Sequence, residues 1–179
     1  MDLTERTLRR NYVYRGKILS LRVDDALRPD GQPCKREIVE HSGGAAVLLV
    51  ADGRVALVKQ YRYAYQEELY EIPAGKLNEG EDPLLAAERE LNEETGFSAE
   101  TLKHIFTLYP SPGYTSEKIF IYEAFSPKKG EQHLDEGEFL KVEFVPLSEA
   151  YEMIEDGRIR DAKTIAALLH RKNCAHSER

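Results

Sequence analysis

Three glutamates on one predicted helix have the residue type and spacing that could hold a metal ion. Glu90 and Glu94 lie one helical turn apart, and Glu93 follows Glu90 by three residues. Like charges at this spacing destabilise an isolated helix by ~0.2–0.5 kcal/mol per pair, and Arg89 is the only cation in the predicted helix. A hard divalent cation with oxygen ligands, above all Mg²⁺, would neutralise this repulsion. The competing interpretation is an acidic helix face that is simply solvated.

The helix that carries these glutamates is predicted over residues 83–95 from local signals. Asp82 can cap the N-terminus, Pro83 suits the first helical position, and Gly96 is a natural residue after the last turn. An apolar stripe at offsets of three and four is formed by Leu84, Ala87 and Leu91. The sequence therefore predicts one helix with acidic side chains beside its apolar stripe.

The complete spacing from residue 75 to residue 97 is more specific than the glutamates alone. The fixed positions are Gly75, Glu81, Arg89-Glu90-Leu91, Glu93-Glu94 and Gly96-Phe97, separated by five, seven, one and one residues. This segment, here called the box, resembles the signature sequence of the Nudix hydrolases, and no position departs from that pattern. The resemblance implies a loop–helix–loop that binds Mg²⁺ or Mn²⁺, in enzymes that cleave nucleoside diphosphates linked to another group.

The resemblance also implies which residues of the box act on the metal. Glu90 and Glu94 would be direct ligands, and Ala74 would add its backbone carbonyl. Glu93 would bind the metal directly, bind it through water, or serve as the catalytic base.

Four other residues of the box would support these ligands. Arg89 and Glu81 would form a pair that orients the glutamates, which is also compatible with a plain surface ion pair. Gly75 and Gly96 would provide structural support.

A second acidic cluster, Asp135-Glu136-Gly137-Glu138, is predicted in a loop just before a strand. Composition alone favours a solvated turn. The cluster also resembles the acidic loop that ADP-ribose pyrophosphatases, a Nudix subgroup, fold over their metal site. That resemblance implies Glu136 as the general base and Glu138 as a further metal ligand, although the two are close enough in sequence to exchange these roles. A carboxylate near several others has a raised proton affinity, which suits a base.

Three further fragments resemble the same subgroup and suggest how the substrate is bound. The fragments are Lys35-Arg36-Glu37-Ile38, Lys59-Gln60-Tyr61-Arg62 and the segment 111–117, which contains Pro112 and Glu117. By position, Arg36 and Arg62 would contact the diphosphate or the terminal ribose, because guanidinium groups suit oxyanions. Glu117 could accept hydrogen bonds from ribose hydroxyls. The alternatives are solubilising charges at strand edges and, for the segment around Pro112, a rigid turn. Tyr14, Tyr61 and Tyr63 are candidates for stacking on adenine.

Composition limits the kinds of partner that the protein can have. The 179 residues suit one domain with a small addition, and 41% hydrophobic with 32% charged residues is typical of a globular protein. A formal net charge of −7 disfavours nucleic acid or an anionic membrane as the main partner. Cys34 and Cys174 show no metal-like spacing, and no apolar segment resembles a signal peptide or a membrane span. We therefore expect a reduced, cytoplasmic protein.

The remaining patterns predict how the chain is organised around the box. Residues 1–41 are predicted as strands, including a hairpin around Asp30-Gly31, and a hairpin this small must pack on another domain or subunit. The resemblance implies that this β-domain mediates homodimerisation. Residues 42–172 would form the Nudix domain, an α/β/α sandwich with a mixed sheet. Its predicted elements include a strand buried on both faces at 45–51, a helix capped by Ser148 and a last helix starting at Asp161. Residues 173–179 are predicted as a frayed tail.

Together these observations predict a Mg²⁺-dependent Nudix hydrolase that splits ADP-ribose into AMP and ribose 5-phosphate. The main alternative is the same reaction on a nucleotide sugar such as GDP-mannose, or on another nucleoside diphosphate derivative. A third alternative is a non-catalytic sensor that binds ADP-ribose. Such a sensor would tolerate loss of the box glutamates, whereas all of them are present here.

Overall fold

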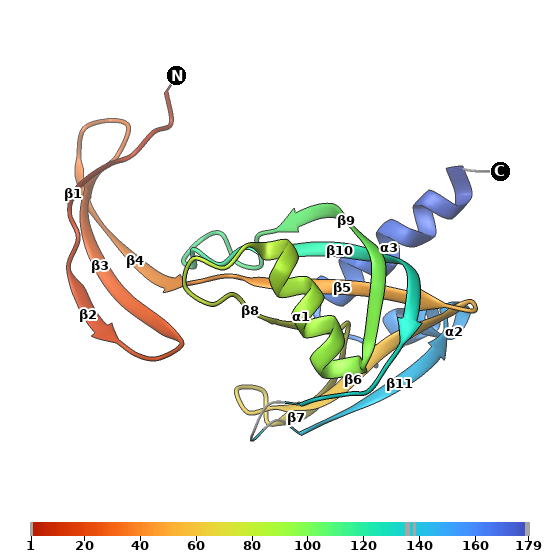
Figure 1. Cartoon of the computed structure of the whole chain (residues 1–179). Helices are drawn as coiled ribbons and strands as arrows, with labels where there is room; N and C mark the ends of the chain where they lie inside the picture. Colours follow the sequence, from red (N-terminus) through yellow and green to blue (C-terminus); the bar gives the residue numbers. More distant parts are fainter. Residues whose placement is uncertain (1, 135–136, 138, 178–179) are drawn as a thin grey trace. The chain divides into compact units, whose positions relative to one another are not determined.

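The computed structural model describes residues 2–134, 137 and 139–177, and it divides into two compact units (Figure 1). The first unit consists of Met1–Gly43 and Tyr109–Lys118. The second consists of Gly44–Leu108 and Ile119–Arg179.

The first unit is an antiparallel sheet built around one long strand. Its strands are β1 (Arg6–Arg9), β2 (Tyr12–Arg15), β3 (Leu19–Leu27) and β4 (Pro33–His41), and β3 pairs with all three of the others. The predicted hairpin is confirmed, because β3 and β4 flank a turn in which Gly31 has a φ of 81° and the Asp30 carboxylate accepts the Gln32 amide. The small antiparallel N-terminal sheet expected from the sequence is therefore present.

The segment Tyr109–Lys118 adds to this sheet at β4. The Val39 amide donates to the Tyr114 carbonyl at 2.8 Å, and the Ser116 amide donates to the Val39 carbonyl at 3.0 Å. The sequence predicted a turn here but not its partner, because local turn signals do not specify which strand edge a loop will meet.

The second unit contains a mixed seven-stranded sheet with helices on both faces. Its main path is β11-β6-β5-β10-β9, with β7 paired to β6 and β8 paired to β5. Only β10 and β5 pair in parallel among the described strands. The elements are β5 (Gly44–Ala51), β6 (Arg54–Arg62), β7 (Glu67–Glu71), β8 (Ala74–Lys76), α1 (Pro83–Thr95), β9 (Phe97–Leu108), β10 (Ile119–Lys129), β11 (Leu140–Pro146), α2 (Leu147–Glu155) and α3 (Ala162–Ser177).

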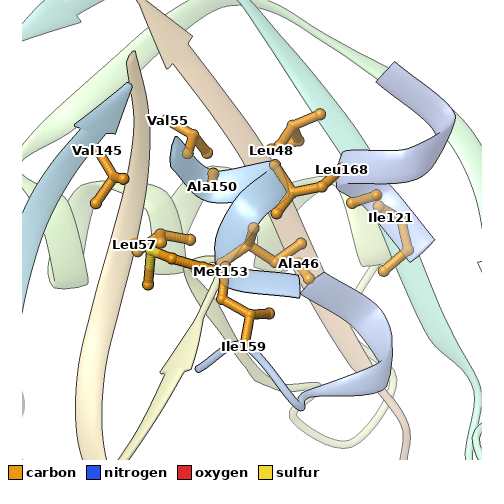
Figure 2. Packing of buried hydrophobic residues seen from close by; sticks show 12 residues of the cluster. Ala46, Leu48, Val55, Leu57, Ile121, Val145, Ala150, Met153, Ile159 and Leu168 are labelled. Carbon is orange, nitrogen blue, oxygen red and sulfur yellow. The ribbon is translucent and has the colours of Figure 1, made fainter. Parts of the chain in front are cut away.

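The central strand β5 is buried on both sides, as its continuous apolar run predicts. Ala46 and Leu48 face a cluster to which α2 and α3 contribute Ala150, Met153, Ala167 and Leu168 (Figure 2). Ala45, Val47 and Leu49 face a second cluster to which α1 contributes Ala86, Ala87 and Leu91. Because successive side chains of a strand point to opposite faces, one strand supports both layers. The predicted α/β/α sandwich is confirmed.

The two C-terminal helices differ from the sequence expectations at two of their four ends. Asp161 caps α3 as predicted, since its carboxylate accepts the Thr164 amide at 3.0 Å. Ser148 does not cap α2, because that helix begins one residue earlier, with Pro146 at the cap position and no side-chain cap bond. Helix α3 extends to Ser177 and so includes residues expected in a frayed tail. In the described part of the chain, no helix combines the length and apolar character needed to cross a membrane.

Candidate active site

Helix α1 has the ends that the sequence predicts, and it directs two of its glutamates toward the core. The Asp82 carboxylate accepts the Leu84 amide at 2.8 Å, and Gly96, with a φ of 72°, donates its amide to the Asn92 carbonyl. The buried residues of the helix are Ala86, Ala87, Glu90, Leu91, Glu94 and Thr95. Leu84, which the periodicity placed in the apolar stripe, is instead 37% exposed.

Glu90 and Glu94 are buried where strand β8 passes α1. Their exposed fractions are 8% and 4%. One carboxylate oxygen of Glu94 accepts the Ala74 amide at 2.8 Å. A Cβ atom added to Gly75 would overlap the carboxyl group of Glu90, closer than the 3.0 Å that real Cβ atoms respect. The backbone at Ala74-Gly75 therefore lies directly against both carboxylates, and only glycine leaves room for Glu90.

Arg89 is the hub of the ion pairs within the box. Its guanidinium donates to Glu81 at 3.0 and 3.1 Å, to Glu90 at 2.7 Å and to Glu93 at 2.9 Å. A further bond at 3.3 Å reaches the Lys76 carbonyl. The bond from Arg89 lowers the pKa of Glu81, and the same bond raises the pKa of Arg89 well above its usual value. Arg89 thus joins the loop before the helix to two glutamates of the helix.

The chemistry of these donors fits a hard divalent cation such as Mg²⁺ or Mn²⁺. Such ions prefer carboxylate and carbonyl oxygens, and the glycine at position 75 leaves room for the Glu90 carboxylate against the backbone. In the described residues, no group of three His, Cys, Asp or Glu side chains already forms a metal cage. Glu90 and Glu93 instead share one amino group of Arg89.

The predicted acidic loop begins beside the C-terminal end of α1. The Gln132 side chain donates to the Glu94 carbonyl, the His133 amide donates to the Glu93 carbonyl at 3.1 Å, and the Gly130 amide donates to the Gly96 carbonyl at 2.7 Å. Glu136 and Glu138 themselves lie outside the described residues. The segment that leads into the loop is nevertheless fixed to the helix that carries the box glutamates.

Arg62, at the end of β6, is held by an acidic residue that the sequence analysis did not single out. Its Nε and Nη2 atoms each donate to a carboxylate oxygen of Glu71 at 2.6 Å, while its side chain remains 41% exposed. The bond to Glu71 raises the pKa of Arg62, and the charge of Glu94 adds to this effect. Arg62 is therefore an oriented arginine within electrostatic range of a box glutamate.

Glu71 lies in a buried polar network that sequence reasoning missed. It is 1% exposed and also accepts a bond from Lys163 at the start of α3. Burial favours the neutral acid, but the bonds from Arg62 and Lys163 outweigh it and lower the pKa of Glu71. The only local signal was the position of this acidic residue at the end of a strand, immediately before Ile72-Pro73-Ala74-Gly75.

Three other predicted substrate residues belong to the first unit. Arg36 forms an ion pair with Glu5 and is exposed. Glu117 lies 3.5 Å from the Nδ1 atom of His41. Pro112 lies in the segment that joins β4. Tyr14 in this unit, and Tyr61 and Tyr63 in the second unit, are exposed at 58%, 56% and 82%, so exposure does not select one of them as the base-stacking residue.

Comparison with known proteins adds evidence that the geometry alone does not contain. Residues 22–168 match the family model described as "NUDIX domain". The chain is 42% identical over 170 residues to an ADP-ribose pyrophosphatase of Bacillus subtilis (strain 168), covering 93% of this chain and 92% of that protein. It is 40% identical over 167 residues to a methanol dehydrogenase activator of Bacillus methanolicus, covering 92% of this chain and 90% of that protein.

A solved structure shows the same fold at lower sequence similarity. It is described as the crystal structure of an ADP compounds hydrolase, and it superposes with a TM-score of 0.86 over 99% of this chain and 98% of that one. The sequence identity is 23%, so this match supports the fold alone.

Proposed function

Because the chain belongs to the Nudix family, we propose that it is a Mg²⁺-dependent pyrophosphohydrolase that cleaves ADP-ribose to AMP and ribose 5-phosphate. The observation that supports the reaction type is the packing of Ala74-Gly75 against Glu90 and Glu94, which places two buried carboxylates against one short stretch of backbone. The substrate is supported by the 42% identical relative named an ADP-ribose pyrophosphatase. A relative of nearly the same identity has a different name, so the substrate must be tested directly.

The residues of the box would hold the metal and orient its ligands. Glu90, Glu94 and the Ala74 carbonyl would be the ligands, with Glu138 as a further one. When bound, Mg²⁺ (or Mn²⁺ in its place) neutralises the diphosphate oxygens and lowers the pKa of water. Glu81 fixes Arg89, which in turn fixes Glu90 and Glu93.

The hydrolysis itself needs a water molecule aligned with the bond that breaks. This water attacks one phosphorus in line with the departing phosphate, and a base accepts its proton. We assign the base to Glu136, with Glu93 as the alternative. Glu93 shares a donor of Arg89 with Glu90, and this arrangement suits a residue that helps to orient the ligands.

Substrate would be bound by cations and by ribose-binding groups outside the box. Arg62 is the best supported of these residues, since Glu71 holds two of its nitrogens and the side chain stays 41% exposed. Arg36, Glu117 and the turn at Pro112 are assigned by resemblance to contacts with the diphosphate and the riboses.

A substrate panel tests this proposal. ADP-ribose, GDP-mannose, a dinucleoside polyphosphate and NADH would be incubated with Mg²⁺ or Mn²⁺, and a phosphatase would then release phosphate from the monoester products. We expect the highest kcat/KM for ADP-ribose, with AMP as a product. A clear preference for GDP-mannose would refute the substrate and retain the reaction, whereas no hydrolysis with either metal would refute both.

The first unit has the exposed apolar side chains expected of a dimerisation surface. They include Leu3, Leu8, Val13, Tyr14 and Ile18, which are between 53% and 75% exposed. Burying such side chains against a second copy would stabilise a homodimer. Light scattering at micromolar protein concentration should give twice the chain mass of 20.4 kDa, and a value of 20.4 kDa would contradict this assignment.

We also assign the enzyme to the cytoplasm. Cys34 and Cys174 are both free, which is compatible with a reducing compartment. Cell fractionation that recovered the enzyme outside the cytoplasm would contradict this assignment.

A further inference from the structure

The buried polar network between β7 and the start of α3 extends beyond Arg62 and Glu71 to three residues that have no role in the mechanism above. It consists of Arg62, Glu71, Asp161, Lys163 and Thr164, together with the backbone amide of Ile72. We propose that Thr164 is a positioning residue for the metal site, because its hydroxyl fixes the backbone that presents the Ala74 carbonyl. This inference rests on the proposed function, in which that carbonyl binds the metal.

The hydroxyl of Thr164 is held in one direction by bonds on both sides. It donates to the Asp161 carboxylate at 2.6 Å and accepts the Ile72 amide at 2.8 Å. Thr164 and Ile72 are both 0% exposed. An amide that loses its partner at such a site cannot turn to water, so the backbone must move or leave the donor unsatisfied.

The neighbouring ion pairs also hold the start of α3 against the end of β7. Lys163 donates to both Glu71 and Asp161, and Glu71 also binds Arg62. Two cations therefore face two carboxylates in the network, which makes the burial of Lys163 and Glu71 possible. The side chain of Lys163 and the hydroxyl of Thr164 thus tie two consecutive helical residues to Glu71, the last residue of β7, and to Ile72, which follows it.

Each residue from Ile72 to Gly75 has its own restraint. The Ile72 amide binds Thr164, the Pro73 carbonyl accepts the Val47 amide at 2.9 Å, and the Ala74 amide binds Glu94. Gly75 pairs with Ala45 and lies against Glu90. The Thr164 bond is the first restraint in this series and the only one of the four supplied by α3. A shift at Ile72 would move the Ala74 carbonyl relative to Glu94.

Two substitutions at residue 164 separate positioning from packing. Thr164→Val keeps the side-chain volume and removes the hydroxyl, whereas Thr164→Ser keeps the hydroxyl and removes a buried methyl group. If Thr164 only fills space, the valine variant should resemble the wild type more closely. If it positions the turn, the serine variant should do so.

The measurements are Mn²⁺ binding to the free enzyme by titration calorimetry, kcat as a function of Mn²⁺ concentration, and Tm. We expect Thr164→Val to weaken Mn²⁺ binding by about tenfold or more, as loss of a residue that supports a metal ligand commonly does. Thr164→Ser should bind Mn²⁺ nearly as tightly as the wild type, even if its Tm is lower. Should the valine variant fail to fold, Thr164→Ala, which also lacks the hydroxyl, takes its place against the serine variant.

The behaviour of the wild type separates the role of Thr164 from the metal-dependent activity itself. If the wild type binds Mn²⁺ and hydrolyses ADP-ribose, equal Mn²⁺ affinities for the hydroxyl-containing and hydroxyl-free variants would overturn the role of Thr164 alone. A loss of Tm without a change in Mn²⁺ affinity would do the same. If the wild type neither binds Mn²⁺ nor hydrolyses any diphosphate, the proposed function fails as well.

Discussion

Replacing Glu94 by glutamine should lower kcat by on the order of 100-fold or more while the protein stays folded, because loss of a direct metal ligand costs at least as much as loss of its support. The glutamine oxygen can still accept the Ala74 amide, which lies 2.8 Å from the Glu94 carboxylate. What is lost is the negative charge of a side chain that is only 4% exposed. We therefore expect weaker metal binding without a loss of helix stability. Initial rates at increasing Mg²⁺ concentration measure the metal-dependent activity, and thermal unfolding measures the stability.

Glu88→Gln is the matched control for this change. Glu88 lies on the same helix, and its substitution also replaces a carboxylate by an amide. It is exposed and is not part of the Arg89 ion pairs. Its kcat and its Mg²⁺ dependence should remain close to those of the wild type. Near-normal activity of Glu94→Gln would remove Glu94 from the metal site.

The same Mg²⁺ titration distinguishes a ligand from a base in the acidic loop. High Mg²⁺ can partly restore a variant that has lost a ligand, whereas it cannot replace a lost proton acceptor. We expect partial recovery for Glu138→Gln and none for Glu136→Gln. The reverse result would exchange the two roles, and full activity of Glu136→Gln would favour Glu93 as the base.

Gly75→Ala should have the second large effect, with a loss of activity out of proportion to the loss of stability. The added methyl group would overlap the carboxyl group of Glu90. Because the overlapping atoms are the end of a flexible side chain, Glu90 can rotate away and the fold can survive. The rotated carboxylate would then leave the place from which, in the proposed function, it binds the metal. We expect kcat/KM to fall on the order of 100-fold, as for other losses in the metal shell.

A double-mutant cycle checks that Glu90 is the cause. In a Glu90→Ala background there is no carboxylate for the new methyl group to meet, so Gly75→Ala should cost little further stability by thermal unfolding. Contacting residues show such non-additive effects, whereas distant ones do not. Equal costs in both backgrounds would mean that the methyl group disturbs β8 itself, for example at its pairing with Ala45.

The parts of the fold that were predictable from sequence are those set by local signals. Helix α1 was predicted to begin at Pro83 and to end before Gly96, because a cap residue, a proline and a glycine act on their immediate neighbours. The strand at 45–51 was predicted to be buried on both faces because its own residues form a continuous apolar run. The box was recognisable because its fixed positions from Gly75 to Phe97 match the Nudix signature without a departure.

The parts that could not be predicted depend on contacts between distant residues. Nothing near Glu71 in the sequence indicates Lys163, because the two are separated by 92 residues. The pairing of segment 109–118 with β4 likewise joins residues that are far apart in the sequence. Even a local signal can be overridden, as at Ser148, where the cap position of α2 falls on Pro146, two residues before the serine. Arg62 was expected to contact substrate, but only the structure shows that Glu71 holds it in place.

The bond between Ile72 and Thr164 has a consequence for the order in which the protein is made. Ribosomes synthesise a chain from its N-terminus, so every glutamate of the box is translated before the hydroxyl to which the Ile72 amide binds. A nascent or prematurely terminated polypeptide that stops before residue 164 contains the whole signature and lacks this support. A message that terminates before codon 164 would thus encode the recognisable motif without the α3 residue that supports it.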